Sequence, residues 1–410
     1  MKNRLKITVL ILLSSIGSLL AEEVSEKVLY IYQDADIANH HESAQAIQQG
    51  IEVAFNEIDN HIAGYKIAFK YLDHRGNVVR SKRNYQIFID DPNALVIYSG
   101  IHSPPLIKNR AFINENKALT LVPWAAGGPI TRYPSPENWV FRLSVDDTQA
   151  GPVIINFAMN NQKCQNPHLL LEESPWGDSN LQSMSKALNN YNIETPRLTR
   201  FSWNLKAKGA RFVLDNIMDK GSDCVILVGN AVEGAIIAKE MLKYPLAQRL
   251  PIISHWGITG GNFHEVVNAD ARKKLNLHFI QSCFSFTNAE QSPLAQQVFE
   301  QLVSYSNGLI TEPKDLKSAV GFIHAYDLTK LLIQAIKQTD LSGDIIKDRE
   351  AIRRALENIK VPIEGLVKTY HKPFSAFDSE KNTNGHEALQ SDSYCMGKYG
   401  QQDEILISDD

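Results

Sequence analysis

The sequence predicts an α/β protein of two doubly wound parallel-sheet lobes. Short β-rich runs alternate with amphipathic helical segments between residues 28 and 281, and they form a group of four and then a group of five. Strands separated by helices of this length indicate parallel sheets that are covered on both faces. Without a 21-residue leader, the mature chain has 389 of the 410 residues. This length exceeds the size of a domain that is built on a single hydrophobic core.

The elements follow one another in a regular order. The first strands are expected at residues 28–32, 67–72, 95–98 and 119–122, and the second group at 168–171, 198–201, 224–228, 251–254 and 277–281. Apolar helical stripes lie between them, one over residues 44–58 and another over 232–242. After residue 281 the pattern is mostly helical, at 295–304, 316–339 and 349–358. Because there is no flexible linker, we expect tight hinge strands and helices that return to the first lobe.

The first 21 residues have the pattern of a secretory signal. Lys2, Arg4 and Lys6 form a basic start, residues 7–13 are apolar, and Ala21 is a small residue suited to cleavage. The alternative is a membrane anchor, but the apolar stretch is too short and is broken by Ser and Gly. No cysteine follows it, which argues against a lipid anchor. We therefore expect export with a cleaved signal.

The charge balance argues against nucleic-acid partners. Without the three basic residues of the leader, 39 basic residues stand against 46 acidic ones, a net charge near −7. There is no basic cluster, and the aromatic residues are not interleaved with Lys or Arg. The sequence therefore predicts a mildly acidic soluble protein.

Four cysteines are widely spaced and fit no zinc pattern: Cys164, Cys224, Cys283 and Cys395. Export to an oxidising compartment permits one or two disulfides. Cys164 lies just before one expected strand and Cys224 opens another, so these two can meet at one edge of a sheet. Four independent buried thiols are the open alternative.

Two loops that follow apolar strands indicate a binding site. After residues 95–98 comes Gly100 to Pro105, in which Ser103 suits a helix N-cap and Pro104 the first helical position. Such a helix start presents free N–H groups and a positive dipole end to an anion or acceptor. After residues 119–122, Trp124 adds an indole wall. Together the loops predict a small-molecule site at the carboxyl ends of parallel strands.

Motifs for catalysis are missing from the sequence. The run His40-His41-Glu42 lacks the second histidine of a metalloprotease helix, and no histidines pair at a metal-ligand spacing. There is no nucleophile elbow, phosphate loop or dinucleotide-binding glycine turn. We therefore expect no enzyme activity, no metal and no cofactor.

Several segments taken together resemble a known family. They are GIEVA at 50–54 with EID at 57–59, DHRGN at 73–77, residues 100–105 and 123–127, FRL at 141–143, WGDS at 176–179 and HEAL at 386–389. In order and spacing the chain resembles the type I periplasmic solute-binding proteins of the branched-chain amino acid (Leu/Ile/Val-binding) group, which serve ABC importers. The resemblance covers nearly the whole mature chain.

This resemblance implies that three hinge crossovers join the lobes and that the ligand is trapped by closure. The first lobe would comprise residues 22–145 and 285–388, and the second 146–284 and 389–410. His102 and Ser103 would hold the ligand carboxylate, helped by backbone groups of the second loop. The full set of expected ligand-binding residues is His102, Ser103, Trp124, Ala125, Ala126, Trp176, Asn230 and Trp256.

The sequence departs from the amino-acid binders at two of these positions. Ala126 stands where a threonine often binds the ligand, and Trp256 where an acid pairs with the ammonium group. A buried ammonium without a counter-charge costs roughly 3 kcal/mol or more. Glu173, Asp178 or Glu233 could supply a replacement carboxylate. Otherwise the tryptophans favour a flat or apolar carboxylate, an amide or a small aromatic acid.

The expected function is the periplasmic substrate-binding component of an ABC importer. It would capture a small organic solute, such as an amino acid, amide or small carboxylate, and deliver it to permease subunits in the inner membrane. We expect a monomer that binds no nucleic acid. The alternative is a periplasmic sensing module that signals to a membrane sensor kinase or chemoreceptor.

Overall fold

The computed structural model describes residues 27–408. The predicted secretory signal and its cleavage site lie outside these residues. Among the described helices, none has both the length and the apolar character needed to cross a membrane.

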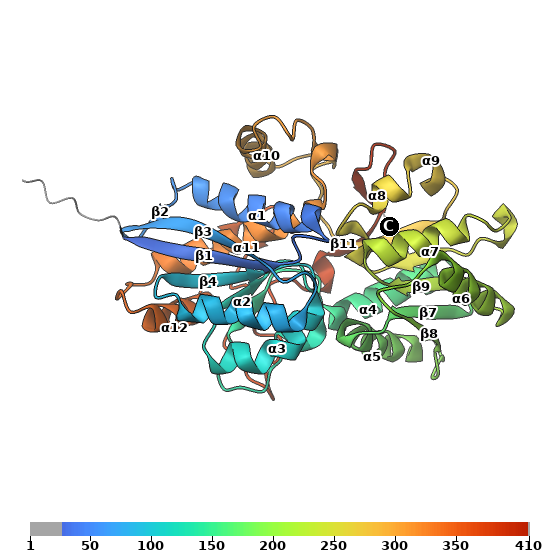
Figure 1. The fold of residues 1–410 in the computed structure, drawn as a ribbon, viewed down its shortest axis with the longest axis horizontal. Helices are drawn as coiled ribbons and strands as arrows, with labels where there is room; N and C mark the ends of the chain where they lie inside the picture. The colour runs from blue at the N-terminus through green and yellow to red at the C-terminus, as the bar shows by residue number, and fades with distance from the viewer. Residues whose placement is uncertain (1–26, 409–410) are drawn as a thin grey trace, which may run out of the picture.

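The first lobe is built on a six-stranded sheet with the order β2-β3-β1-β4-β5-β6. Its strands are β1 (Val28–Ala35), β2 (His61–Ile62), β3 (Tyr65–Asp73), β4 (Ala94–Ser99), β5 (Thr120–Val122) and β6 (Val140–Arg142). All neighbours are parallel except β2 and β3. One face is covered by α1 (His41–Asn56) and α11 (Ala319–Lys337), and the other by α2 (Val78–Asp90) and α3 (Ser103–Glu115) (Figure 1).

The second lobe is built on a seven-stranded sheet with the order β15-β14-β11-β10-β9-β7-β8. Five parallel strands are β7 (Pro167–Glu172), β8 (Arg197–Phe201), β9 (Cys224–Val228), β10 (Ile252–Ser254) and β11 (Leu277–Ser282). The chain end adds β14 (Tyr394–Tyr399) and β15 (Ile405–Ile407) antiparallel at one edge. The longer helices are α4 (Asp147–Asn156), α5 (Pro175–Asn189), α6 (Ala207–Asp219) and α7 (Ala231–Met241), with short turns at α8 (Phe263–Val266) and α9 (Ala269–Arg272).

The predicted fold class of two doubly wound parallel-sheet lobes is confirmed. All nine expected strands form, and none of their ends is shifted by more than three residues. The sequence did not indicate β2, β6, β14, β15 or the hairpin of β12 (Ile363–Glu364) and β13 (Thr369–Tyr370) as strands. Five of these strands have only two or three residues. β14 has six, but it finds its partner β11 only after a long excursion of the chain, so no local pattern specifies the pairing.

After β11 the chain returns to the first lobe, where α10 (Pro293–Tyr305), α11 and α12 (Ile345–Leu356) lie (Figure 1). The last helix begins at Ile345, four residues before the expected start. Asp344 caps it there, because its side chain accepts hydrogen bonds from the N–H groups of Ile346 and Lys347. Close packing of α11 on α1 requires Gly50, since a Cβ there would lie 2.4 Å from the carbonyl oxygen of Phe322.

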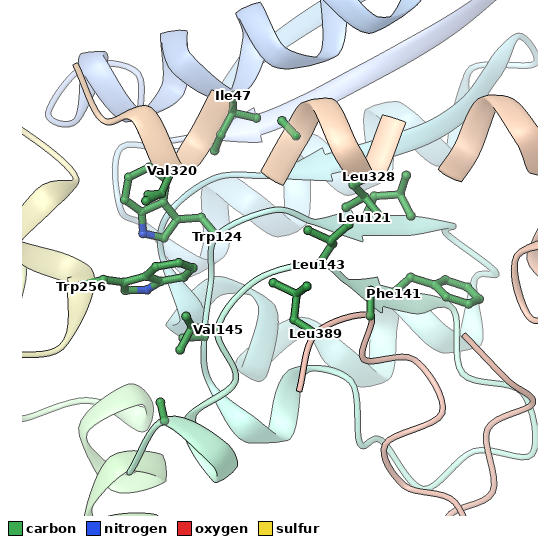
Figure 2. Packing of buried hydrophobic residues seen from close by; sticks show 14 of the residues in the cluster. Ile47, Leu121, Trp124, Phe141, Leu143, Val145, Trp256, Val320, Leu328 and Leu389 are labelled. Atoms are coloured by element: carbon green, nitrogen blue, oxygen red, sulfur yellow. The ribbon is translucent and has the colours of Figure 1, made fainter. Parts of the chain in front are cut away.

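The chain passes between the two sheets three times: after β6, after β11 and before β14. The first and third passages run side by side. Arg142 donates its N–H to the carbonyl of His386, and Ala388 donates to the carbonyl of Arg142, each at 2.9 Å. One apolar cluster continues through these crossovers into both lobes, and Figure 2 shows part of it around Leu143 and Leu389.

Two disulfides involve all four cysteines. Cys164 is bonded to Cys224 at the start of β9, with a Cα–Cα distance of 6.0 Å. Cys283 is bonded to Cys395 of β14, with a Cα–Cα distance of 4.9 Å. The second pair joins the crossover after β11 to the strand that follows the last crossover, so it lies at the hinge.

Candidate functional site

A cavity lies between the lobes, at the carboxyl ends of strands from both sheets. Residues of the first lobe that line it are Ile101, His102, Ser103, Pro104, Trp124 and Ala126, and those of the second are Glu172, Trp176, Asn230, Trp256 and Gly257. Seven of the eight expected site residues are therefore brought together. Ala125 is the exception, because it packs into an apolar cluster of the first lobe behind the loop.

The cavity is nearly closed in this arrangement of the lobes. Its volume is about 10 Å³, which is at most the space of one water molecule. The indoles of Trp124 and Trp256 face each other across the lobe boundary with ring centroids 5.8 Å apart (Figure 2). In this arrangement of the lobes, the cavity is too small for an organic solute.

Polar contacts also join the two lobes. The N–H of Gly128 donates to Oγ of Ser179 at 2.9 Å, and Oγ of Ser318 donates to the carbonyl of Thr259 at 3.1 Å. These bonds are made only when the lobes are together, so they favour the closed arrangement.

The first-lobe loops are tied to each other through Ser103. Its expected role as N-cap is wrong: α3 begins at Ser103, and His102 occupies the cap position without a side-chain cap bond. Instead, Oγ of Ser103 accepts a hydrogen bond from the N–H of Gly127 at 3.1 Å. A Cβ at Gly127 would lie 3.1 Å from Cβ of Ser103, so the close approach of the loops favours glycine there.

A buried arginine supports the second loop from the crossovers. Arg142 donates to the carbonyls of Gly127 at 2.9 Å and Ala125 at 3.3 Å, and it pairs with Asp146 and Glu387. Burial alone would raise the pKa of Asp146, but Arg142 and a second arginine hold that pKa below its usual value. The loop that carries Trp124 is thus fixed by the same ion pairs that order the hinge.

Trp176 is held in the cavity by a buried acid on the neighbouring helix. Its Nε1–H donates to Oδ1 of Asp147 at 3.2 Å, and Nε2 of His255 lies 3.0 Å from the same oxygen. Asp147 opens α4 directly after the first crossover. The position of this indole therefore depends on the hinge geometry.

A carboxylate that the sequence analysis overlooked, Glu172, lines the cavity. Nδ2 of Asn230 donates to one of its oxygens at 3.1 Å and Oγ of Ser174 to the other at 2.6 Å. Burial raises the pKa of Glu172. The signal that could have identified it is the alternation of side chains along a strand, which directs Glu172 and Glu173 to opposite sides.

None of the three acids proposed from the sequence lines the cavity. Glu173 and Asp178 are exposed, and Asp178 pairs with Arg200 at 2.8 Å. Asp178 lies in the first turn of α5, which begins at Pro175 and is capped by Ser174. Glu233 is buried in the first turn of α7, where burial and the charge of Glu172 raise its pKa to about 7.

One donor in the cavity wall has no partner among the described residues. The Nε1–H of Trp124 is buried and makes no hydrogen bond. An unpaired buried donor is costly, and this one lies where an acceptor group in the cavity would satisfy it.

Comparisons with known proteins agree with this architecture. The profile of one protein family, described as periplasmic binding protein, matches residues 38–388. None of the curated proteins matches the sequence.

Solved structures resemble the chain over most of its length. A periplasmic binding protein type 1 from Bordetella pertussis Tohama I has a TM-score of 0.76 and 16% identity, covering 93% of this chain and 100% of its own. The leucine binding protein LivK from Thermotoga maritima has a TM-score of 0.73 and 16% identity, covering 93% of this chain and 98% of its own. A solute binding protein from R. palustris in complex with benzoate has a TM-score of 0.70 and 17% identity, covering 93% of this chain and 95% of its own.

Proposed function

The chain belongs to the periplasmic binding protein family, and we propose that it captures a small organic solute between its lobes and delivers it to an ABC importer. Membership implies a periplasmic location. The family consists of solute-binding proteins, so we propose that the chain performs no covalent chemistry. Its partners are then the solute and the permease subunits of the inner membrane.

The observation that carries this proposal is a cavity lined by both lobes and sealed where they meet. A solute held there contacts the first and second lobes at once, so it binds the closed form better than the open one. Binding therefore shifts the population toward closure, and a permease can recognise the closed shape. The three crossovers supply the hinge about which the lobes move.

The cavity lining supports a solute that combines a flat or apolar body with an acceptor group. Trp124, Trp176 and Trp256 offer aromatic surfaces, and the unpaired Nε1–H of Trp124 suits a carboxylate or amide oxygen. Among the first three residues of α3, only Ser103 offers a backbone N–H at the same place, because Pro104 and Pro105 have none. Benzoate, found with the R. palustris protein, is one solute of this kind.

Glu172 extends the set of solutes that the cavity could hold. When ionised it can pair with an ammonium group, and when protonated it can donate to an acceptor. We therefore propose an amino acid, an amide or a small carboxylate as the solute. In this proposal His102 and Ser103 contact the acceptor group of the solute. Asn230 holds the carboxylate of Glu172 in position to contact the remaining part of the solute.

Mass spectrometry of the solute released by denaturing the purified protein tests this function. A single small organic compound is expected, present at close to one molecule per chain. Calorimetry with that compound must then show binding that Trp176→Ala weakens at least tenfold. Equal binding by wild type and variant would contradict the site.

A further inference from the structure

A second constellation of ligand-type atoms lies at the edge of the first lobe. Asp36 follows β1, His40 precedes α1, and His102 precedes α3, so the three side chains come from two loops of one sheet edge. Oδ2 of Asp36 lies 3.2 Å from Nδ1 of His40 and 3.1 Å from Nε2 of His102. Their exposed fractions are 2%, 8% and 5%, so the cluster is shielded from solvent.

The three atoms have the separations of a small metal site. All of them lie within 4.8 Å of one another. A tetrahedral Zn²⁺ with ligands at 2.0–2.1 Å sets neighbouring ligand atoms about 3.3 Å apart. Two of the three separations, 3.1 and 3.2 Å, are close to that value, and the third is no longer than 4.8 Å.

We propose that Asp36, His40 and His102 bind one Zn²⁺ ion. Two imidazole nitrogens and one carboxylate oxygen suit this borderline cation, and three protein ligands leave a coordination position for water or an acceptor group. Without the ion, the carboxylate of Asp36 accepts a hydrogen bond from each ring, so binding the ion requires each ring to carry its proton on the other nitrogen instead.

A neighbouring residue, Asn39, orients the carboxylate of this cluster. Oδ1 of Asp36 accepts hydrogen bonds from the N–H and the Nδ2–H of Asn39, at 3.2 and 2.9 Å, which directs Oδ2 toward the two rings. Such outer contacts fix ligand orientation in metal sites.

The site also adjoins the solute cavity and the lobe boundary. His102 lines the cavity, and the ring of Trp203 from the second lobe lies over it with centroids 5.4 Å apart. The ion therefore enters and leaves when the lobes separate. Closure places Trp203 over the ligands and slows exchange.

Calorimetric titration of Zn²⁺ into untagged, chelator-treated protein tests the proposal. One ion per chain is expected, and His40→Ala is expected to lower the affinity at least tenfold. His41→Ala is the matched control, because His41 is the adjacent histidine and is exposed. Circular dichroism verifies that each variant is folded. Equal affinity in wild type and His40→Ala would overturn the proposal, as would loss of binding in His41→Ala alone.

Cobalt gives an independent readout that does not depend on heats. Co²⁺ added to the wild type should produce the visible absorption of a low-coordinate nitrogen and oxygen site, and His102→Gln should abolish it. If His102→Gln does not fold, the His40→Ala variant provides the same test. A spectrum of hexahydrated Co²⁺ with the folded wild type would overturn the site. No solute is present in these measurements. Their outcome therefore tests the metal site independently of the proposed transport function.

Discussion

Trp124 of the first lobe and Trp256 of the second lobe meet with ring centroids 5.8 Å apart, and each is only 1% exposed. The two indoles belong to the apolar cluster that runs through both lobes while they also line the cavity. In the function that we propose, solute binding and lobe packing therefore share the same side chains. A solute that enters between the indoles must itself contact both rings, because the contact between Trp124 and Trp256 is then lost.

Trp124→Ala is expected to lower the free energy of unfolding by about 3–5 kcal/mol, because it removes a large buried side chain. The indole also packs on α11, where a Cβ at Gly321 would lie 2.8 Å from it. Urea denaturation measures the change. Trp203→Ala is the control, because the side chain of Trp203 is 37% exposed. If both variants lose a similar amount of unfolding free energy, burial of Trp124 at the lobe boundary is not the cause.

Ser103→Ala is expected to destabilise the protein by about 1–3 kcal/mol, because the buried N–H of Gly127 loses its acceptor. Thermal unfolding of the solute-free protein measures this. Ser202→Ala removes an exposed hydroxyl and should have little effect. An unchanged midpoint for Ser103→Ala would show that the two loops are held together by other contacts.

Glu387→Gln is expected to cost about 3–5 kcal/mol, since it leaves the buried guanidinium of Arg142 without half of its counter-charge. Because Arg142 also supports the loop carrying Trp124, solute affinity should fall in parallel. Denaturation and calorimetry measure the two effects. The exposed Glu380→Gln serves as control, and a stable Glu387→Gln with normal affinity would argue against this coupling.

The Cys164→Ser/Cys224→Ser double variant is expected to lose about 2–4 kcal/mol of stability, because its disulfide closes a chain segment with a sequence separation of 60. Denaturation without reductant measures the loss. Reductant should then lower the stability of the wild type more than that of the variant. If reductant lowers the stability of the wild type and of the double variant equally, the disulfide between Cys164 and Cys224 does not form in the protein.

Glu233→Gln is expected to change the pH dependence of stability. The pKa of Glu233 is about 7 in the folded protein against an ordinary value of 4.5, so the folded state binds more protons than the unfolded state between these values. The unfolding free energy of the wild type should therefore fall relative to Glu233→Gln as pH rises from about 5 to 8. Allowing for solvent screening, the difference is about 1–2 kcal/mol. Parallel pH profiles of thermal unfolding would contradict the raised pKa.

The site was predictable where it depends on local pattern. Apolar strands followed by Gly100 to Pro105 and Pro123 to Gly127 mark the carboxyl ends of one sheet, and seven of the eight expected residues line the cavity. Hydrogen bonds were not predictable in this way. Ser103 has the sequence context of a cap, yet its hydroxyl bonds to Gly127 because the two loops approach closely.

The sequence by itself determined the alternation of strands and helices, since apolar periodicity is a property of neighbouring residues. The tertiary structure decided which distant groups meet: Cys283 with Cys395, Glu172 with Asn230, and Asp36 with His102. The histidines show the difference most plainly. No sequence spacing links His40 to His102, but the parallel order of β1 and β4 places the loops that follow them side by side. Contacts of this kind depend on sheet order, which no local segment specifies.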